Sequence, residues 1–149
     1  MYKHIIVAAD DSPTSRRAVE EAAALSLSSG ARLTVVHAVD EALFAHFNRV
    51  TLASRDAVQQ ALIKEGQSVL DSAVATATAA GATAEGRLLA SEHQSTSDQI
   101  VQAVSGLGAD LLVVGSHGRR GVQRMLLGSV AEKLLKKVSI SVMVVRGTT

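Results

Sequence analysis

The sequence predicts an open α/β domain in which helices cover both faces of a mostly parallel sheet. Short β-branched apolar runs alternate along the chain with longer segments whose apolar residues recur at helical spacing. Because parallel neighbours need helical crossovers, this alternation favours a doubly wound sheet. The length of 149 residues suits one domain, and no internal repeat is visible. We therefore expect a single domain over residues 1–149.

The first elements are the most clearly marked. The apolar run from His4 to Ala9 predicts a strand buried on both faces. Ser12 is an expected N-cap, and Pro13 suits the first position of the helix that follows. That helix is expected to end at Gly30, and the valine-rich run from Arg32 to Val39 predicts the second strand.

The middle of the chain is less regular. In residues 40–52 the apolar residues follow neither the spacing of a helix nor that of a strand, and we interpret this segment as a mobile flap. An alanine-rich helix is expected from about Ala53 to Ala80 and is closed by Gly81. Weak alternation from Thr83 to Ala90 predicts the third strand.

Two further helix–strand pairs complete the pattern. Ser95 or Ser97 is expected to cap a helix that Gly106 and Gly108 stop, before a strand over Asp110 to Val114. The last helix is expected to begin at Gly128-Ser129 and to end at Lys136-Lys137. A fifth strand then covers Ile140 to Val145.

Composition excludes several classes of function. The net charge of +1, from 15 basic and 14 acidic side chains, offers no extended basic surface for nucleic acid or anionic lipid. No apolar run reaches the roughly 18 residues of a membrane span. No signal peptide is recognisable, and the chain has no cysteine for a disulfide or thiolate site. We expect a cytoplasmic protein with no nucleic-acid or membrane partner.

The segment 115–129, GSHGRRGVQRMLLGS, carries the strongest functional signal. Gly115, Gly118, Gly128 and Ser129 have the spacing G-x2-G-x9-G-S between a predicted strand and a predicted helix. Glycine permits positive φ and lets a phosphate approach the backbone, while a helix N-terminus favours anions. The alternative is a glycine-rich turn that only reverses the chain. We favour a phosphate-binding loop.

Two familiar nucleotide motifs are absent from this loop. The lysine of the G-x-x-x-x-G-K-[ST] pattern is missing, and the spacing is not the G-x-G-x-x-G of dinucleotide-binding proteins. No arrangement of serine, histidine and acid suggests a nucleophile. The pattern therefore favours holding a nucleotide over cleaving it, and we assign no catalytic residue.

Polar residues near the strand ends are further candidates. Asp10 ends a buried strand and either accepts a hydrogen bond from an adenine amino group or caps the helix that starts at Ser12. We favour ligand contact for Asp10 and a capping role for Asp11. His117 either touches ribose or phosphate or is a hydrogen-bonded turn residue. The loop arginines either neutralise phosphate or are solvated; they are Arg119, Arg120 and Arg124.

Three segments of the chain resemble the universal stress protein family, and together they cover essentially its whole length. They read HIIVAADDSPTS at the start, LTVVHAV in the second strand, and ADLLVVGSHGRRGVQRMLLGSVAEKLLKKVSISVMVVR at the end. The last carries the motif G-x2-G-x9-G-[ST] of the family's ATP-binding branch. The chain departs from the family at Asp11, often glycine, at residues 91–95, which replace Gly-x-Pro, and at Ile140-Ser141, which replaces Cys-Pro.

The resemblance implies a Rossmann-like sheet of five parallel strands in the order 3-2-1-4-5 and a bound adenine nucleotide. Asp10 and the Ala38 backbone would meet adenine, and Gly115 would lie near ribose. Gly118, Gly128 and Ser129 would hold phosphates bridged by Mg²⁺ or Mn²⁺. The full expected binding set is Ala9, Asp10, Ala38, Gly115, Ser116, His117, Gly118, Arg119, Gly128, Ser129 and Val130.

The resemblance also implies a homodimer paired through the last strand, Ser141 to Val145. The function we expect is ATP-dependent regulation or sensing in a stress response, read by a protein partner that the sequence does not identify. The ligand can also be AMP, ADP or cyclic AMP. A slow ATPase or phosphotransferase, and a nucleotide-free module that binds a partner, are the alternatives.

Overall fold

The computed structural model describes residues 1–40, 43, 46, 49, 54–118 and 127–147. Five strands form one parallel sheet in the order β3-β2-β1-β4-β5, as expected. The strands are β1 His4–Ala8, β2 Arg32–Ala38, β3 Ala84–Leu89, β4 Leu111–Gly115 and β5 Ser141–Val145. The helices are α1 Pro13–Ser29, α3 Arg55–Ala79, α4 Thr96–Leu107 and α5 Ser129–Lys137.

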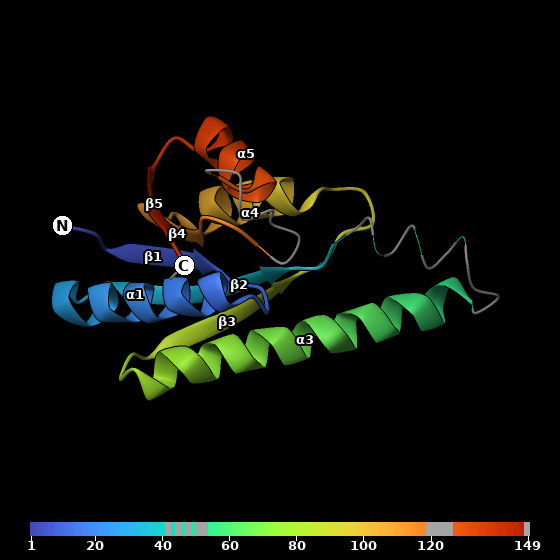
Figure 1. Cartoon of the computed structure of the whole chain (residues 1–149), viewed down its shortest axis with the longest axis horizontal. Helices are drawn as coiled ribbons and strands as arrows, with labels where there is room; N and C mark the ends of the chain where they lie inside the picture. The colour runs from blue at the N-terminus through green and yellow to red at the C-terminus, as the bar shows by residue number, and fades with distance from the viewer. Residues whose placement is uncertain (41–42, 44–45, 47–48, 50–53, 119–126, 148–149) are drawn as a thin grey trace.

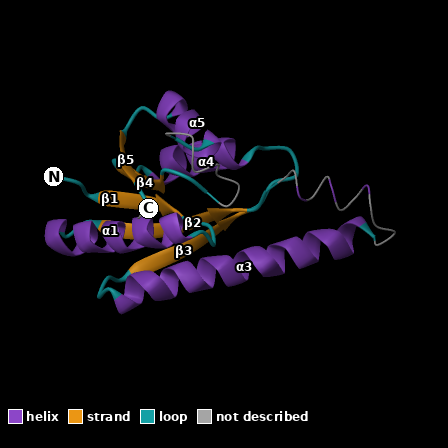
Figure 2. Ribbon diagram, in the orientation of Figure 1, coloured by secondary structure: helices purple, strands orange, loops and turns teal. Residues whose placement is uncertain are grey.

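The helices form a layer on each face of the sheet (Figures 1 and 2). Ile5 and Val7 of β1 pack with α1 and α3 on one face. Ile6 between them points to the other face, where it packs with α4 and α5. This alternation follows from the pleat of a strand. Because β1 has apolar cover on both sides, its sequence is a continuous apolar run, which made it easy to predict.

Cap residues fix where several helices begin and end. Ser12 caps α1, and its side chain accepts a hydrogen bond from the Ser15 N–H, so Asp11 is not the cap that we expected. Ser95 caps α4 in the same way, whereas Ser97 lies inside the helix. Gly108, in the left-handed region at φ 66°, ends α4. The prediction that Gly106 also stops this helix is wrong, because Gly106 is helical.

The strand register brings the ends of β1 and β4 side by side. Ala8 pairs with Val114, and β4 continues to Gly115, one residue beyond the expected end. The polar turn after β1 and the glycine loop after β4 therefore leave the same edge of the sheet. This is where doubly wound sheets reverse their strand order and bind ligands.

Most of the expected flap at 40–52, and the three loop arginines at 119, 120 and 124, lie outside the described residues. Those expectations stay predictions. In the part of the chain that the structure describes, no helix is both long enough and apolar enough to cross a bilayer.

Asp110, just before β4, anchors the start of β1. Its carboxylate accepts hydrogen bonds from the backbone N–H groups of His4, at 3.0 Å, and Lys3, at 2.9 Å. These bonds, that from His4 first, hold the pKa of the Asp110 carboxyl below its usual value of 3.8. A depressed carboxyl pKa stabilises the fold fully above the unfolded value, and the stabilisation disappears as the pH falls through the folded value.

Replacing Asp110 by asparagine should therefore lower the melting temperature at neutral pH. The difference from the parent should shrink once the pH falls below 3.8, because the parent then loses the same charge. Thermal unfolding followed by circular dichroism across this range measures both effects. Asp71→Asn, on the exposed face of α3, is the matched control. A difference that stays constant down to acid pH would contradict the role given to the Asp110 charge.

Candidate functional site

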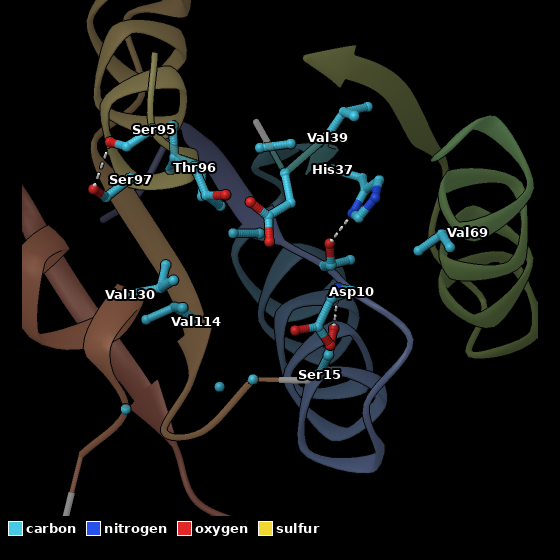
Figure 3. A pocket seen from close by; sticks show the side chains of 18 of the residues that line it. Asp10, Ser15, His37, Val39, Val69, Ser95, Thr96, Ser97, Val114 and Val130 are labelled. Carbon is cyan, nitrogen blue, oxygen red and sulfur yellow. Dashed lines mark hydrogen bonds between the residues drawn. The ribbon is translucent and has the colours of Figure 1, made fainter. Parts of the chain in front are cut away.

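A pocket of about 710 Å³ opens at the carboxyl edge of the sheet, between the two helical layers (Figure 3). The turn after β1, the end of β2, the glycine loop and the first turns of α4 and α5 contribute to its walls. The N-terminal half of α3 extends beyond the strand ends and supplies another wall (Figure 1). Of the expected binding residues, the pocket is lined by Ala9, Asp10, Ala38, Gly115, His117, Gly118, Gly128, Ser129 and Val130.

Asp10 is held in one orientation at the floor of this pocket. Its backbone N–H donates to Ser15 Oγ at 2.7 Å, and its Oδ1 accepts from the Ser12 N–H at 2.8 Å. The second oxygen, Oδ2, faces the glycine loop, since a Cβ added to Gly118 would lie 2.9 Å from it. The sequence thus places an oriented hydrogen-bond acceptor directly beside the loop.

The loop glycines serve close approach and not backbone conformation. None of Gly115, Gly118 and Gly128 has the positive φ that we gave as one reason for glycine here. A Cβ at Gly128 would lie 3.0 Å from the Ser116 carbonyl oxygen and 3.2 Å from His117 Cα. The Gly128 N–H also donates to that carbonyl, at 2.6 Å. Glycine therefore lets the two ends of the loop meet.

The first turn of α5 faces the pocket without a side-chain cap. Gly128 is its N-cap and offers no side chain, so within the described residues no side-chain cap occupies the first N–H groups of the helix. Ser129 adds a hydroxyl at the same place, and Ser129 and Val130 both line the pocket. Uncapped N–H groups and the helix dipole together favour an anion at this end.

Ser116 is the one described member of the expected set that does not line the pocket. It is buried, its N–H donates to the Val145 carbonyl at 2.8 Å, and its Oγ lies 3.0 Å from His117 Nδ1. Ser116 therefore attaches the glycine loop to the end of β5. His117 reaches the pocket beside it.

Sequence reasoning missed the walls that come from helices. One signal was available in α3, where a glycine, Gly66, lies inside a long continuous helix. A Cβ at Gly66 would lie 3.0 Å from Val39 Cγ2 and 3.2 Å from Leu88 Cδ1, so glycine lets α3 approach β2 and β3. The missed lining residues are Ala8, Ser15, His37, Val39, Asp40, Leu43, Leu62, Glu65, Gly66, Val69, Ser95, Thr96, Ser97, Ile100, Val114, Ala131 and Lys133.

His37, which lines the pocket, joins the ends of two strands. Its Nδ1 lies 2.7 Å from the Ala9 carbonyl oxygen, and the ring is buried (Figure 3). This bond fixes Ala9, the residue after β1, against β2 and next to Asp10. It also accounts for a histidine in the second strand that has no metal-ligand spacing.

The pocket carries little that would hold a metal ion by itself. Among the described residues, no three histidine or acidic side chains gather as a cation site. A Mg²⁺ or Mn²⁺ ion at this site would therefore have to enter with ligand phosphates, as Mg²⁺ commonly does. The Ser129 hydroxyl, at the first turn of α5, would add an oxygen donor to such an ion.

The sheet and its edge pocket define a class: doubly wound α/β proteins that bind ligands where the strand order reverses. Within that class, the model of the universal stress protein family matches residues 1–146, and the chain belongs to this family. It is 29% identical to universal stress protein A homolog 1 of Coxiella burnetii, over 97% of this chain and 96% of that protein.

Solved structures agree with the architecture. MJ0577 of Methanocaldococcus jannaschii shares the fold, with a TM-score of 0.83 at 23% identity over 100% of this chain and 99% of the other. A universal stress protein in complex with cAMP has a TM-score of 0.72 and 29% identity, over 99% of this chain and 98% of the other. The universal stress protein from Archaeoglobus fulgidus in complex with dAMP has a TM-score of 0.71 and 25% identity, over 97% of this chain and 98% of the other.

Proposed function

We propose that this protein binds an adenine nucleotide, with ATP as the preferred ligand, and acts as a nucleotide-dependent regulator in the cytoplasm. The observation that carries the proposal is the pairing of two features in one pocket. An oriented carboxylate, Asp10, and the uncapped first turn of α5 both line it. The first suits the amino group of a base, and the second suits phosphate.

In this proposal Asp10 Oδ2 accepts a hydrogen bond from the adenine amino group, and the Ala38 backbone meets the ring. The chain has only three aromatic residues, so the ring is expected to lie against aliphatic groups. Val39, Leu62 and Ile100 line the pocket and are candidates for that contact. The relatives solved with cAMP and dAMP support an adenine-containing ligand.

The phosphates are assigned to the N–H groups of Gly118 and Ser129. They would pass close to Gly128, whose own N–H is bonded to the Ser116 carbonyl. A divalent cation would enter with them. Arg119 lies outside the described residues and stays a predicted phosphate contact. Bound metal would supply positive charge to the phosphate chain. The protein groups would orient that chain and screen it from water.

We propose binding without turnover, and a homodimer through β5. This strand is the edge of the sheet, so its outer side is available for pairing with a second copy. A protein partner would then read the nucleotide-bound surface. Single-turnover assays with labelled ATP check the absence of turnover, and release of phosphate that Ser129→Ala suppresses while ATP stays bound would instead favour the enzyme.

Calorimetric titration with ATP, ADP, AMP and cyclic AMP tests the binding proposal, together with mass analysis of any nucleotide that co-purifies. We expect heat with adenine nucleotides, tightest for ATP. Asp10→Ala should lower the affinity for each nucleotide by roughly tenfold, which corresponds to the loss of one charge-assisted hydrogen bond. Asp71→Ala, on the exposed face of α3, should change nothing. A folded protein that gives no heat with any of the four ligands would refute the proposal.

A further inference from the structure

Lys133 of α5 lines the pocket and lies four residues after Ser129. Residues four apart share one face of a helix, so Lys133 and Ser129 both face the pocket. Side chains on a helix also lean toward its N-terminus. The Lys133 side chain therefore extends back toward the uncapped first turn that we assign to phosphate.

Each neighbouring lysine on α5 has an acidic partner. Lys136 pairs with Glu132 at 3.2 Å, and Lys137 pairs with Asp98 at 2.6 Å. The hydrogen bond from Lys137 is the main reason that the pKa of Asp98 lies below its usual value, and the charge of Lys133 contributes least. Within the described residues no acid forms an ion pair with Lys133. Its ammonium is therefore available to a ligand.

Charge in the pocket is distributed unevenly. The carboxylates of Asp10, Asp40 and Glu65 line it from the β1, β2 and α3 side. The first turns of α4 and α5 line it from the other side, where Figure 3 shows Ser95, Thr96 and Val130. Lys133 of α5 also lines the pocket. Helix N-termini carry partial positive charge, which the lysine reinforces. A nucleotide is thus favoured in one orientation, with amino groups toward the acids and phosphates toward Lys133.

We propose that Lys133 contacts the outermost phosphate of the bound nucleotide and so sets the preference for a triphosphate over a monophosphate. The inference rests on the proposed adenine-nucleotide function and adds a specificity-determining residue outside the glycine loop. A cation at this place adds attraction for each further negative charge on the phosphate chain. It adds little for adenosine, which has none.

Titration of adenosine, AMP, ADP and ATP into the parent protein and three variants tests this role. Lys133→Gln should lower the affinity for ATP by roughly tenfold, because one charge-assisted contact is lost. The affinity for adenosine should be unchanged. Lys133→Arg should retain the preference for ATP. Lys136→Gln removes the same charge outside the pocket and should bind every ligand as the parent does. The salt dependence of ATP binding should fall in Lys133→Gln alone.

The outcomes separate two kinds of failure. If the parent binds no adenine compound, the proposed function fails and this inference fails with it. If the parent binds ATP but Lys133→Gln lowers the affinities for adenosine and ATP equally, or lowers neither, only the role of Lys133 is refuted. Lys133 is exposed on α5, so its variants are expected to melt at the parent temperature, which circular dichroism confirms before titration.

Discussion

Replacing Gly118 by valine is expected to weaken adenine-nucleotide binding strongly while leaving the protein folded. A Cβ at this position would lie 2.9 Å from Asp10 Oδ2, which is closer than such atoms approach. The carboxylate cannot simply rotate away, because the Ser12 N–H holds its other oxygen. The valine also occupies pocket volume beside the assigned phosphate site. We expect affinity for ATP to fall by roughly 100-fold, the equivalent of about two charge-assisted hydrogen bonds.

Gly106→Val is the matched control for this substitution. Gly106 lies in α4 and has no atom within 4 Å of an added Cβ, so the same change meets open space. Binding should match the parent, and stability should be unchanged or slightly higher, since valine suits a helix better than glycine. Calorimetry measures both proteins. Undiminished ATP affinity in Gly118→Val would show that the loop does not meet the nucleotide beside Asp10.

Leu134→Ala should cause the largest loss of stability among the substitutions considered. Leu134 is 0% exposed and packs on the α4/α5 face of the sheet with Ile6 and Leu112. Truncation removes buried apolar contact and leaves a cavity that the surrounding structure fills only in part. The free energy of unfolding should fall by about 3 kcal/mol. Urea unfolding measures this as a lower midpoint at constant slope.

The adjacent residue supplies the control. Leu135 is on the same helix but is 45% exposed, so Leu135→Ala makes the same chemical change largely in solvent. Its cost should stay within about 0.5 kcal/mol. A loss in Leu134→Ala as small as that in Leu135→Ala would mean that the packing of α5 against the sheet contributes little to stability.

The fold was predictable because its strands carry continuous apolar runs and its helices carry local start and stop signals. Ser12, Pro13 and Gly30 mark α1 in sequence and in structure alike. Strand order came from the family resemblance, and the register of β1 and β4 agrees with it. The error at Gly106 has a simple cause. A glycine inside a helix looks like a stop when a second glycine follows closely.

The candidate site was predictable only where it follows strand ends. Asp10 and the loop glycines are local in sequence to β1 and β4, so their convergence followed from topology. Thr96, Glu65 and Lys133 reach the same pocket from three different helices. Which turn of a helix faces a pocket depends on how the helix packs, and apolar periodicity does not reveal that for a polar residue. The close packing at Gly66 is likewise a tertiary effect.

The hydrogen bond from the Ser116 N–H to the Val145 carbonyl, at 2.8 Å, ties the glycine loop to the edge strand. Ligand occupancy and subunit association would then be thermodynamically linked wherever a second copy pairs along that strand. Linkage is reciprocal, so a nucleotide that tightens assembly must itself be held more tightly by the assembled form, by the same factor. The abundance of the protein would thus tune its own response to the adenylate pool.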